Sequence, residues 1–322
     1  MSLAVAIQMD PIEGIDIEAD STFALAIEAE RRGHGLFHYL PQDLTFRHGR
    51  VLAKAHPMKV RREKGNHFTF GDKQSIDLAA VDVVLMRQDP PFDMAYITAT
   101  HLLEHLTKTT LIVNDPVEVR NAPEKLFVTN FAKLMPPTLI TSDRQEILMF
   151  RKEYGDIVLK PLFGNGGRGV LHISQEDENL NALLELFTEL YKEPIVVQRY
   201  LPEVRNGDKR IILVEGKAVG AINRIPPPGE ARSNLHVGGK AKRATLNAHD
   251  HLICESIGES LRERGLIFVG IDVIGKCITE INVTSPTGIL EIDRFDNISV
   301  GEKIWDAIEA RHTAMCGGRL ME

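Results

Sequence analysis

Three side chains that carry oxygen atoms lie close together in the segment from Gly265 to Gly288. Asp272 lies on one apolar run, and Glu280 and Asn282 lie two residues apart on the next run. Because side chains alternate between the faces of a strand, Glu280 and Asn282 point the same way. Carboxylate and amide oxygens suit Mg²⁺, which commonly has few protein ligands and holds phosphate groups as well. The pattern predicts a magnesium site, and a solvent-facing hairpin with polar side chains is the alternative.

The two carboxylates can share a metal only if the hairpin between them is irregular. A two-residue turn would pair Asp272 with Thr279, and Glu280 would then point to the opposite face. The magnesium site therefore requires an odd connection or a bulge between residues 274 and 279 that sets Asp272 opposite Glu280. Gly275 is the residue best able to adopt the unusual dihedral angles that this requires.

A lysine precedes a glycine-rich loop in the segment IVLKPLFGNGGRGV. Lys160 lies on an apolar strand, where its ammonium group needs an anionic partner. The loop after it has four glycines in six residues, so its backbone N–H groups can approach a phosphate closely. No Gly-Lys-Ser/Thr opens a helix here, so the loop is not a P-loop, and an ordinary flexible turn is the alternative. Lys125, at an expected helix start, is either a second phosphate-facing lysine or a solvated one.

Two further strand ends carry groups that suit a nucleotide and a carboxylate. The run from Val196 to Pro202 leaves an apolar strand for a turn, where exposed backbone groups can bind an adenine edge; a plain core strand is the alternative. Arg210 and Arg224 lie on the next two strands. Arginines on strands beside a phosphate site suit bidentate binding of carboxylates or phosphates, although either could form a surface ion pair.

The composition limits the classes of protein to consider. The chain has 322 residues, 43% of them hydrophobic, and a net charge of −7. The negative charge argues against a general nucleic-acid surface, so an anionic ligand needs a local cluster of positive groups. No apolar run reaches the roughly 18 residues of a membrane span, and the first residues lack signal-peptide features, so we expect a cytoplasmic protein. Cys254, Cys277 and Cys316 have no metal-ligand spacing, which favours core or incidental positions.

The first 120 residues alternate between strand and helix patterns. Strands are predicted at 3–8, 81–87 and 110–115, and helices at 21–32 and 95–106. This order favours a small, mostly parallel sheet with helices on its faces. The polar stretch from Phe46 to Ser75 interrupts the order. Its basic run is either a hairpin or an irregular excursion, and a solvated face is the default interpretation.

The rest of the chain has short β-rich runs with few helices between them. Helices are predicted at 123–134 and 144–153, and strands at 137–141, 157–162, 169–173, 195–201, 209–214 and 218–225. This order favours a mixed α+β unit with antiparallel strands. The segment from Pro226 to Arg243 combines prolines, glycines and basic residues, which is typical of a flexible lid.

Several strings in the chain match one family. They are EKLF, VLKPLFGNGG, GDKR, DPPFD and GIDVIG followed by TEINVTSPTG. With them the chain resembles the ATP-grasp carboxylate–amine ligases and, within these, the bacterial glutathione synthetases, over nearly its whole length. The resemblance implies an α/β and α+β protein with an ATP-grasp fold and an amino-terminal preATP-grasp α/β domain. It implies a preATP-grasp domain at 1–120, a small ATP-grasp subdomain at 121–200 and a large subdomain at 201–322.

The same resemblance implies the reaction and its partners. The substrates would be ATP, γ-glutamylcysteine and glycine, with Mg²⁺, or Mn²⁺ in its place, as the metal. No nucleic acid or membrane is involved, and a homo-oligomer, either dimer or tetramer, is implied. Another ATP-grasp ligase acting on glutamate or D-alanine, or a non-catalytic nucleotide-binding module of this fold, are the alternative functions.

The resemblance also assigns site residues. The metal ligands would be Asp272, Glu280 and Asn282. ATP would be bound by Lys125, Lys160, Gly164, Asn165, Gly166, Gly167, Gln198, Tyr200, Leu201 and Asp208. Arg210 and Arg224 would orient the reacting carboxylate and the acyl phosphate. The peptide substrate would be held by Arg232, Ser285, Pro286 and Thr287.

The resemblance also bears on Leu290 and on the lid. Leu290 stands where the family is expected to carry an arginine or another polar residue, so a ligand contact at that position is in doubt. The lid is expected to carry Arg232, Lys240, Lys242 and Arg243 toward the phosphates and to exclude water from the acyl phosphate.

Overall fold

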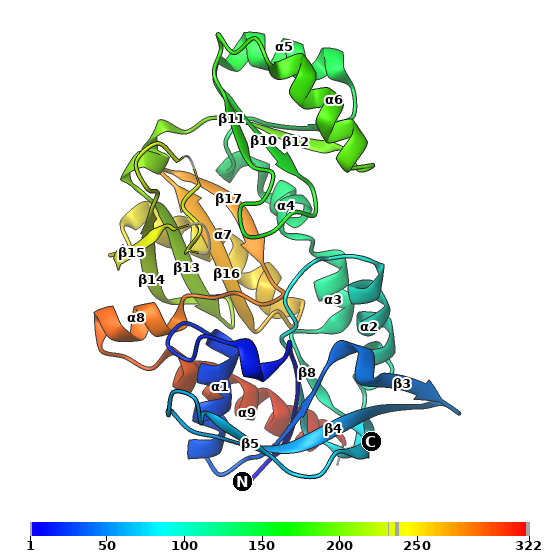
Figure 1. Cartoon of the computed structure of the whole chain (residues 1–322). Coiled ribbons are helices and arrows are strands. Elements are labelled where there is room, and N and C mark those ends of the chain that lie inside the picture. Colours follow the sequence, from blue (N-terminus) through cyan, green and yellow to red (C-terminus); the bar gives the residue numbers. More distant parts are fainter. Residues whose placement is uncertain (1, 231, 236–237, 320–322) are drawn as a thin grey trace.

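The computed structural model describes residues 2–230, 232–235 and 238–319 of the chain. Three β-sheets organise these residues, with eight, four and five strands. The eight-stranded sheet lies at the bottom of Figure 1, the five-stranded sheet in the middle and the four-stranded sheet at the top.

The amino-terminal sheet has a parallel centre and an antiparallel wing. Its strand order is β3-β4-β2-β1-β7-β8, and β5 and β6 also pair with β4. The parallel strands are β1 (Ala4–Gln8), β2 (Gly35–Tyr39), β7 (Val83–Met86) and β8 (Leu111–Val113). The antiparallel strands are β3 (Leu44–Arg47), β4 (Arg50–Val60), β5 (Phe68–Phe70) and β6 (Gln74–Asp77). The predicted parallel strands are confirmed, but the sheet is larger than expected and is mixed, because β4 adds an antiparallel wing.

Residues 46–75 form antiparallel strands and not an irregular excursion, so the hairpin alternative is confirmed. Most of this segment forms β4 and the strands that pair with it. Val51, Ala53 and Ala55 alternate with more exposed neighbours along β4 and are buried. The strand is therefore amphipathic with a period of two, and its lysines and arginines lie on the outer face.

The helices of this part are α1 (Ser21–Arg31), α2 (Met94–Glu104) and α3 (Pro116–Asn121). Each begins after an aspartate whose side chain accepts hydrogen bonds from backbone N–H groups of the first turn, namely Asp20, Asp93 and Asp115. These caps satisfy donors that a helix start otherwise leaves unpaired.

The four-stranded sheet is antiparallel and has the order β11-β10-β12-β9. Its elements are β9 (Thr138–Thr141), α5 (Arg144–Tyr154), β10 (Ile157–Pro161), β11 (Leu171–Ile173), α6 (Leu180–Leu190) and β12 (Ile195–Arg199). Before it, the helix predicted at 123–134 is divided into α4 (Glu124–Phe127) and a 3₁₀ helix (Val128–Leu134). The Thr129 and Asn130 side chains donate to carbonyls of the preceding turn, which competes with regular α-helical geometry.

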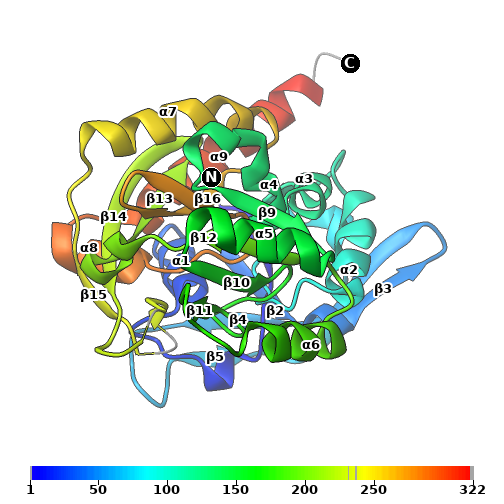
Figure 2. The same cartoon turned by 90° about the horizontal axis from the view of Figure 1, so that it is seen from above.

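The five-stranded sheet is antiparallel and has the order β15-β14-β13-β16-β17. Its strands are β13 (Asp208–Val214), β14 (Lys217–Ile225), β15 (Lys240–Arg243), β16 (Phe268–Ile274) and β17 (Cys277–Asn282). Helix α7 (Ala248–Glu263) covers its outer face (Figure 2). The opposite face is turned toward the other two sheets.

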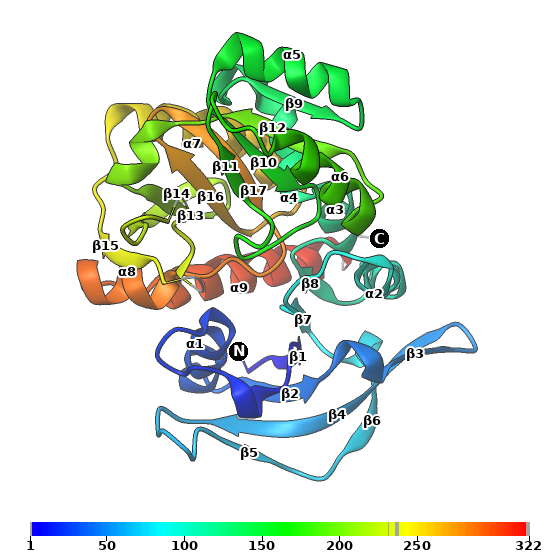
Figure 3. The same ribbon diagram turned by 45° about the horizontal axis from the view of Figure 1, so that its top comes forward.

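The carboxyl-terminal helices join this sheet to the amino-terminal part. They are α8 (Ile289–Asp296) and α9 (Val300–Arg319), and α9 runs between the two sheets in Figure 3. Trp305 of α9 is fully buried, and its indole N–H donates to the carbonyl of Leu25 in α1 at 2.9 Å. One core cluster therefore combines the start and the end of the chain. Within the described ranges, no helix is both long and apolar enough to span a bilayer.

The cysteines differ in exposure, which gives a test of the packing of α7. Cys254 is buried on the inner side of α7, and burial raises the pKa of its thiol to about 12. We expect it to be inert toward a thiol reagent at pH 8 in the native protein, because only the thiolate reacts. Cys277 and Cys316 are half-buried and serve as internal controls. Mass spectrometry after brief labelling would show the order in which the three cysteines react. Rapid labelling of Cys254 in native protein would contradict this packing.

Candidate active site

A cavity of about 500 Å³ lies between the three sheets. This volume is in the range of small-molecule sites. The cavity is lined by the glycine-rich loop, by the inner face of the five-stranded sheet and by two loops of the amino-terminal part. The residues assigned above to ATP, the peptide substrate and the metal all line it, whereas Lys240, Lys242 and Arg243 of the expected lid do not. The structure therefore brings together residues that are up to 162 positions apart, from Lys125 to Thr287.

The hairpin of β16 and β17 contains the required irregularity. Ile274 pairs with Cys277 and Val273 with Ile278, as in a regular two-residue hairpin. The register then shifts, and Asp272 pairs with Glu280, so Thr279 is the extra residue of a bulge. The predicted bulge is confirmed, and it lies at Thr279 and not at Gly275, whose φ of 60° serves the turn.

Three charged residues form one row across three strands. Arg210 of β13 pairs with Asp272 of β16, which in turn pairs with Glu280 of β17. Gly270 makes room for this row, because a Cβ atom there would approach Pro286 to 2.9 Å and the Arg210 side chain to 3.2 Å. The sheet therefore presents a carboxylate between a cation and a second carboxylate.

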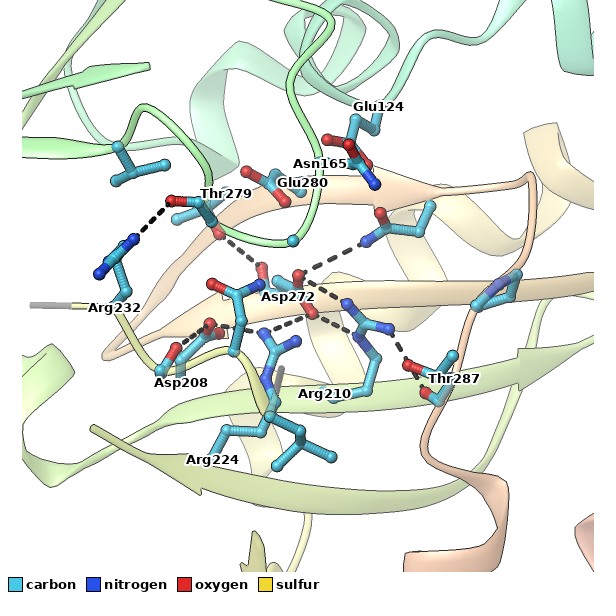
Figure 4. A pocket seen from close by; sticks show the side chains of 18 of the residues that line it. Glu124, Asn165, Asp208, Arg210, Arg224, Arg232, Asp272, Thr279, Glu280 and Thr287 are labelled. Carbon is cyan, nitrogen blue, oxygen red and sulfur yellow. Dashed lines mark hydrogen bonds and ion pairs between the residues drawn. The ribbon is translucent and has the colours of Figure 1, made fainter. Parts of the chain in front are cut away.

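Asp272 is held by both arginines. Arg210 donates to it through Nε and Nη2 at 2.5 and 2.9 Å, and Arg224 through Nη2 at 2.9 Å (Figure 4). Asp272 is buried. Burial alone would raise the pKa of this carboxyl, but the two guanidinium groups hold it well below its usual range. The group is therefore a carboxylate at any physiological pH.

Glu280 faces the two lysines of the predicted phosphate site. Its Oε1 lies 3.5 Å from Nζ of Lys160 and 3.8 Å from Nζ of Lys125. Burial opposes ionisation of Glu280, but the lysines keep its pKa below the ordinary value. Lys125 is buried, and it donates to the carbonyl of Gly164 at 2.6 Å and also contacts Glu124. It thus connects α4 to the start of the glycine-rich loop.

The three predicted metal ligands fit a hard divalent cation. Asp272 and Glu280 pair across the two strands, and Nδ2 of Asn282 donates to Asp272 Oδ2 at 3.4 Å. All three line the cavity and offer oxygen atoms. No group of three His, Cys, Asp or Glu side chains in the described residues is placed to hold a metal, so such a site needs the amide as third ligand.

A second ion pair lies beside the first. Arg224 donates to Oδ2 of Asp208 at 2.5 Å, and Ser233 donates to the same oxygen at 2.7 Å. Among the described residues, Asp208 Oδ1 and Arg224 Nε have no hydrogen-bond partner, although both residues line the cavity. Buried polar atoms of this kind are costly unless a ligand or water meets them.

Part of the lid reaches the cavity. Arg232 lines it and donates to the carbonyl of Gly167 at 3.4 Å, which connects the lid to the glycine-rich loop. Lys240, Lys242 and Arg243 do not point to the phosphate region as expected: they lie on β15, and Arg243 pairs with Asp296 at 2.9 Å. Pairing of β15 with β14 fixes these residues outside the cavity. Residues 231, 236 and 237 of the lid lie outside the described residues.

The predicted adenine-binding part of the cavity is the carboxyl end of strand β12 and the segment that follows it. Gln198 is buried and donates to the Thr138 hydroxyl at 2.9 Å, and Tyr200 and Leu201 line the cavity beside it. The Tyr200 ring stacks on His172, with 3.9 Å between centroids. An apolar wall with backbone groups at a strand end is suited to a flat heterocycle.

The resemblance implies that the amino-terminal unit contributes substrate contacts, but it names no residues there. Arg87 is buried and donates to the carbonyl of Pro286 at 3.1 Å. The hydroxyl of Ser285 donates to Asp89 at 2.8 Å. These contacts hold the segment around Ser285 to Thr287 against the first domain. The DPPFD string, which is part of the family resemblance, begins at Asp89 and is the sequence signal for this contact.

Position 290 is apolar for a structural reason. Leu290 is buried in the core cluster that joins the two domains and does not line the cavity. Its neighbour Glu291 does line the cavity. The doubt about a ligand contact at Leu290 was therefore justified.

Comparisons with known proteins agree with this architecture. The structure of the D-cycloserine synthetase DcsG aligns with a TM-score of 0.68 at 14% identity and covers 96% of this chain and 100% of that one. The ATP-grasp ligase PsnB, in a complex described as containing minimal precursor, Mg and ADP, aligns at 0.60 and 15% identity over 96% and 98%. The fold and the cavity thus define an ATP-grasp protein.

The sequence comparisons are more specific. Models of the prokaryotic glutathione synthetase N-terminal domain and ATP-grasp domain match residues 3–120 and 124–297. The glutathione synthetase of Brucella melitensis is 58% identical over 311 residues, which are 97% of this chain and 100% of the relative. The chain belongs to the prokaryotic glutathione synthetase family and is an ATP-dependent ligase.

Proposed function

We propose that the cavity joins γ-glutamylcysteine to glycine, with ATP cleaved to ADP and phosphate. The observation that carries this proposal is the charged row of Arg210, Asp272 and Glu280, which lies next to Lys125 and Lys160 in one cavity. Transfer of the terminal phosphoryl group to the cysteinyl carboxylate brings two anions together. Cations placed in advance around the reacting groups are the main source of catalysis for such a step.

Each residue set then has a distinct task. Lys125, Lys160 and the loop Gly164–Gly167 bind the phosphates, and Gln198, Tyr200 and Leu201 bind the adenine. Arg210 and Arg224 orient the carboxylate and neutralise the acyl phosphate, which the glycine amine attacks. Arg232, Ser285, Pro286 and Thr287 hold the peptide substrate, and Asp208 fixes Arg224 through their ion pair.

Asp272, Glu280 and Asn282 would hold Mg²⁺. Bound there, the ion neutralises phosphate charge beside the lysines. The fit of the three oxygen-bearing side chains supports this assignment, as does the description of PsnB as a complex with Mg and ADP. Mn²⁺ prefers similar ligands and would serve as a substitute.

An assay of ligation tests the proposal. Purified protein is incubated with ATP, Mg²⁺ and γ-glutamylcysteine, and ADP release is followed after addition of glycine, D-alanine or glutamate. We expect turnover that depends on γ-glutamylcysteine and is fastest with glycine, with tripeptide formed in proportion to ADP. Turnover with D-alanine or glutamate in place of these substrates would favour another ATP-grasp ligase.

The contact between Arg232 and Gly167 predicts that loss of the Arg232 side chain weakens the coupling of ATP cleavage to peptide-bond formation. Arg232→Ala removes the hydrogen bond from the lid to the glycine-rich loop, so water gains access to the acyl phosphate. We expect more than one ADP per tripeptide, whereas the parent protein forms one. Arg243→Ala is the matched control, because that arginine lies in the adjoining strand and pairs with Asp296 outside the cavity. An unchanged ratio in Arg232→Ala would exclude this role.

We also propose that the protein is a cytoplasmic homo-oligomer, either a dimer or a tetramer. The family resemblance supports this proposal, and the use of ATP as a substrate fits a location inside the cell. Light scattering on purified full-length protein would distinguish a monomer, a dimer and a tetramer.

A further inference from the structure

One carboxylate in the cavity wall has no part in the reaction as described. Glu291 lies in the first turn of α8, is 7% exposed and lines the cavity. Its Oε1 accepts a hydrogen bond from Arg294 at 3.3 Å. Its Oε2 has no hydrogen-bond partner among the described residues. A buried charged oxygen without a partner is costly, so its presence in a cavity wall points to a ligand.

The surroundings of Glu291 indicate the charge of that ligand. Burial raises the pKa of Glu291, the nearby carboxylate of Asp16 raises it further, and Arg294 lowers it. Asp16 lines the same cavity, whereas Arg294 lies on the outer side of α8 with 56% of its side chain exposed. Arg210, Arg224 and Lys160 face Asp272, Asp208 and Glu280 instead, and the buried Arg87 interacts with Asp20 and Asp89, which line the same cavity. This part of the wall therefore has an excess of negative charge.

The position of Glu291 relates it to the reacting carboxylate. Arg210 donates to the carbonyl of Thr287 at 3.4 Å, and Gly288 lies beside the Arg210 side chain. Glu291 follows Gly288 by three residues, which is about one helical turn, or roughly 5 Å along α8. Helix α8 also contacts α1 of the amino-terminal part, and Asp16, which precedes α1, lines the same cavity. A substrate whose carboxylate is bound by Arg210 can extend another of its groups to this point.

We propose that Glu291, with Asp16 beside it, binds a primary ammonium group of a substrate. The inference rests on the proposed function, which supplies two such groups, the α-ammonium of the glutamyl residue and the ammonium of glycine. A charge-assisted hydrogen bond from either group satisfies Oε2 and is about twice as strong as a neutral one. For the glutamyl group, the subsite fixes the amine end of the peptide while its cysteinyl carboxylate reacts. For glycine, it holds the group that reacts, and the ammonium must lose a proton before the amine attacks the acyl phosphate.

Glu291→Gln tests the subsite because it removes the charge and keeps the shape. We expect the KM for one of the two amine substrates to rise about tenfold or more, the scale of a lost hydrogen bond to a charged group. The KM for ATP should change by less than about twofold, as for a substitution away from the nucleotide. The substrate whose KM rises is the source of the ammonium group.

Asp296→Asn is the matched control. It removes a carboxylate from the same helix, but Asp296 pairs with the exposed Arg243 and does not line the cavity. It should leave each KM within about twofold of the parent value. If both variants raise the same KM equally, a general effect on α8 explains the result and the subsite is wrong.

A binding measurement separates this inference from the proposed reaction. γ-Glutamylcysteine and glutarylcysteine, which lacks only the amino group, are titrated calorimetrically in the presence of Mg²⁺ and a non-hydrolysable ATP analogue. If Glu291 binds the glutamyl ammonium, the parent protein prefers γ-glutamylcysteine and Glu291→Gln loses that preference. Equal preference in both proteins, together with unchanged KM values for glycine and γ-glutamylcysteine, overturns the subsite. Failure of the parent protein to ligate glycine overturns the reaction instead, because the binding comparison requires no turnover.

Discussion

Glu280→Gln is expected to reduce ligation by at least about a hundredfold, the scale of losing one transition-state electrostatic contact, while the protein stays folded. Glu280 is a proposed metal ligand, and its Oε1 lies near Lys125 and Lys160. Its side chain is 18% exposed, so the uncharged amide can be hydrated at the cavity surface. ADP release at saturating Mg²⁺ measures the loss, and circular dichroism checks the fold. Normal turnover would remove Glu280 from the metal site.

Asp272→Asn is compared with Glu280→Gln to separate the effect on catalysis from the effect on stability. It should lose ligation to a similar extent, but it also leaves Arg210 and Arg224 without their shared carboxylate in a buried place. An uncompensated buried charge costs about 3–5 kcal/mol. The two variants should therefore match in activity and differ in urea midpoint. Equal midpoints for Asp272→Asn and Glu280→Gln would contradict the structural part that we assign to Asp272.

Arg210→Met is expected to lower the free energy of unfolding by about 3–5 kcal/mol, because the buried Asp272 loses its bidentate partner. The double variant Arg210→Met/Asp272→Asn should lose less than the sum of the two single variants, since it removes both charges. Arg224 still has Asp208 in that background. Urea denaturation of the four proteins measures the coupling, and additivity within about 0.5 kcal/mol would show that the pair is not coupled.

Much of the site could be predicted because its chemistry is local in the sequence. Glu280 and Asn282 lie on one strand face, and Lys160 directly precedes the glycine-rich loop. The irregularity followed from the period of two, since a regular two-residue hairpin would set Asp272 opposite Thr279; of the two possibilities, an odd connection or a bulge, the structure has the bulge.

What could not be predicted depends on contacts between distant segments. Ser285 and Asp89 are 196 positions apart, and neither position alone indicates that they meet. The wing of the amino-terminal sheet could be predicted only as one of two alternatives. The alternation of Val51, Ala53 and Ala55 favours a strand, but the many basic residues of the 46–75 segment are also compatible with an irregular excursion. Glu291 was passed over because its burial depends on how α8 packs against α1 and β14.

The bulge at Thr279 has a consequence for variation in chain length. Without Thr279, Ile278 and Glu280 would be consecutive, and a regular two-residue hairpin would still pair Val273 with Ile278 and Asp272 with Glu280. Deletion of this one residue would thus straighten β17 and keep Asp272 and Glu280 on the inner face. It would remove the hydrogen bond from the Thr279 hydroxyl to the Asp272 carbonyl. The gain of one codon would leave two surplus residues to accommodate. Relatives should therefore differ at this hairpin by shortening more readily than by lengthening.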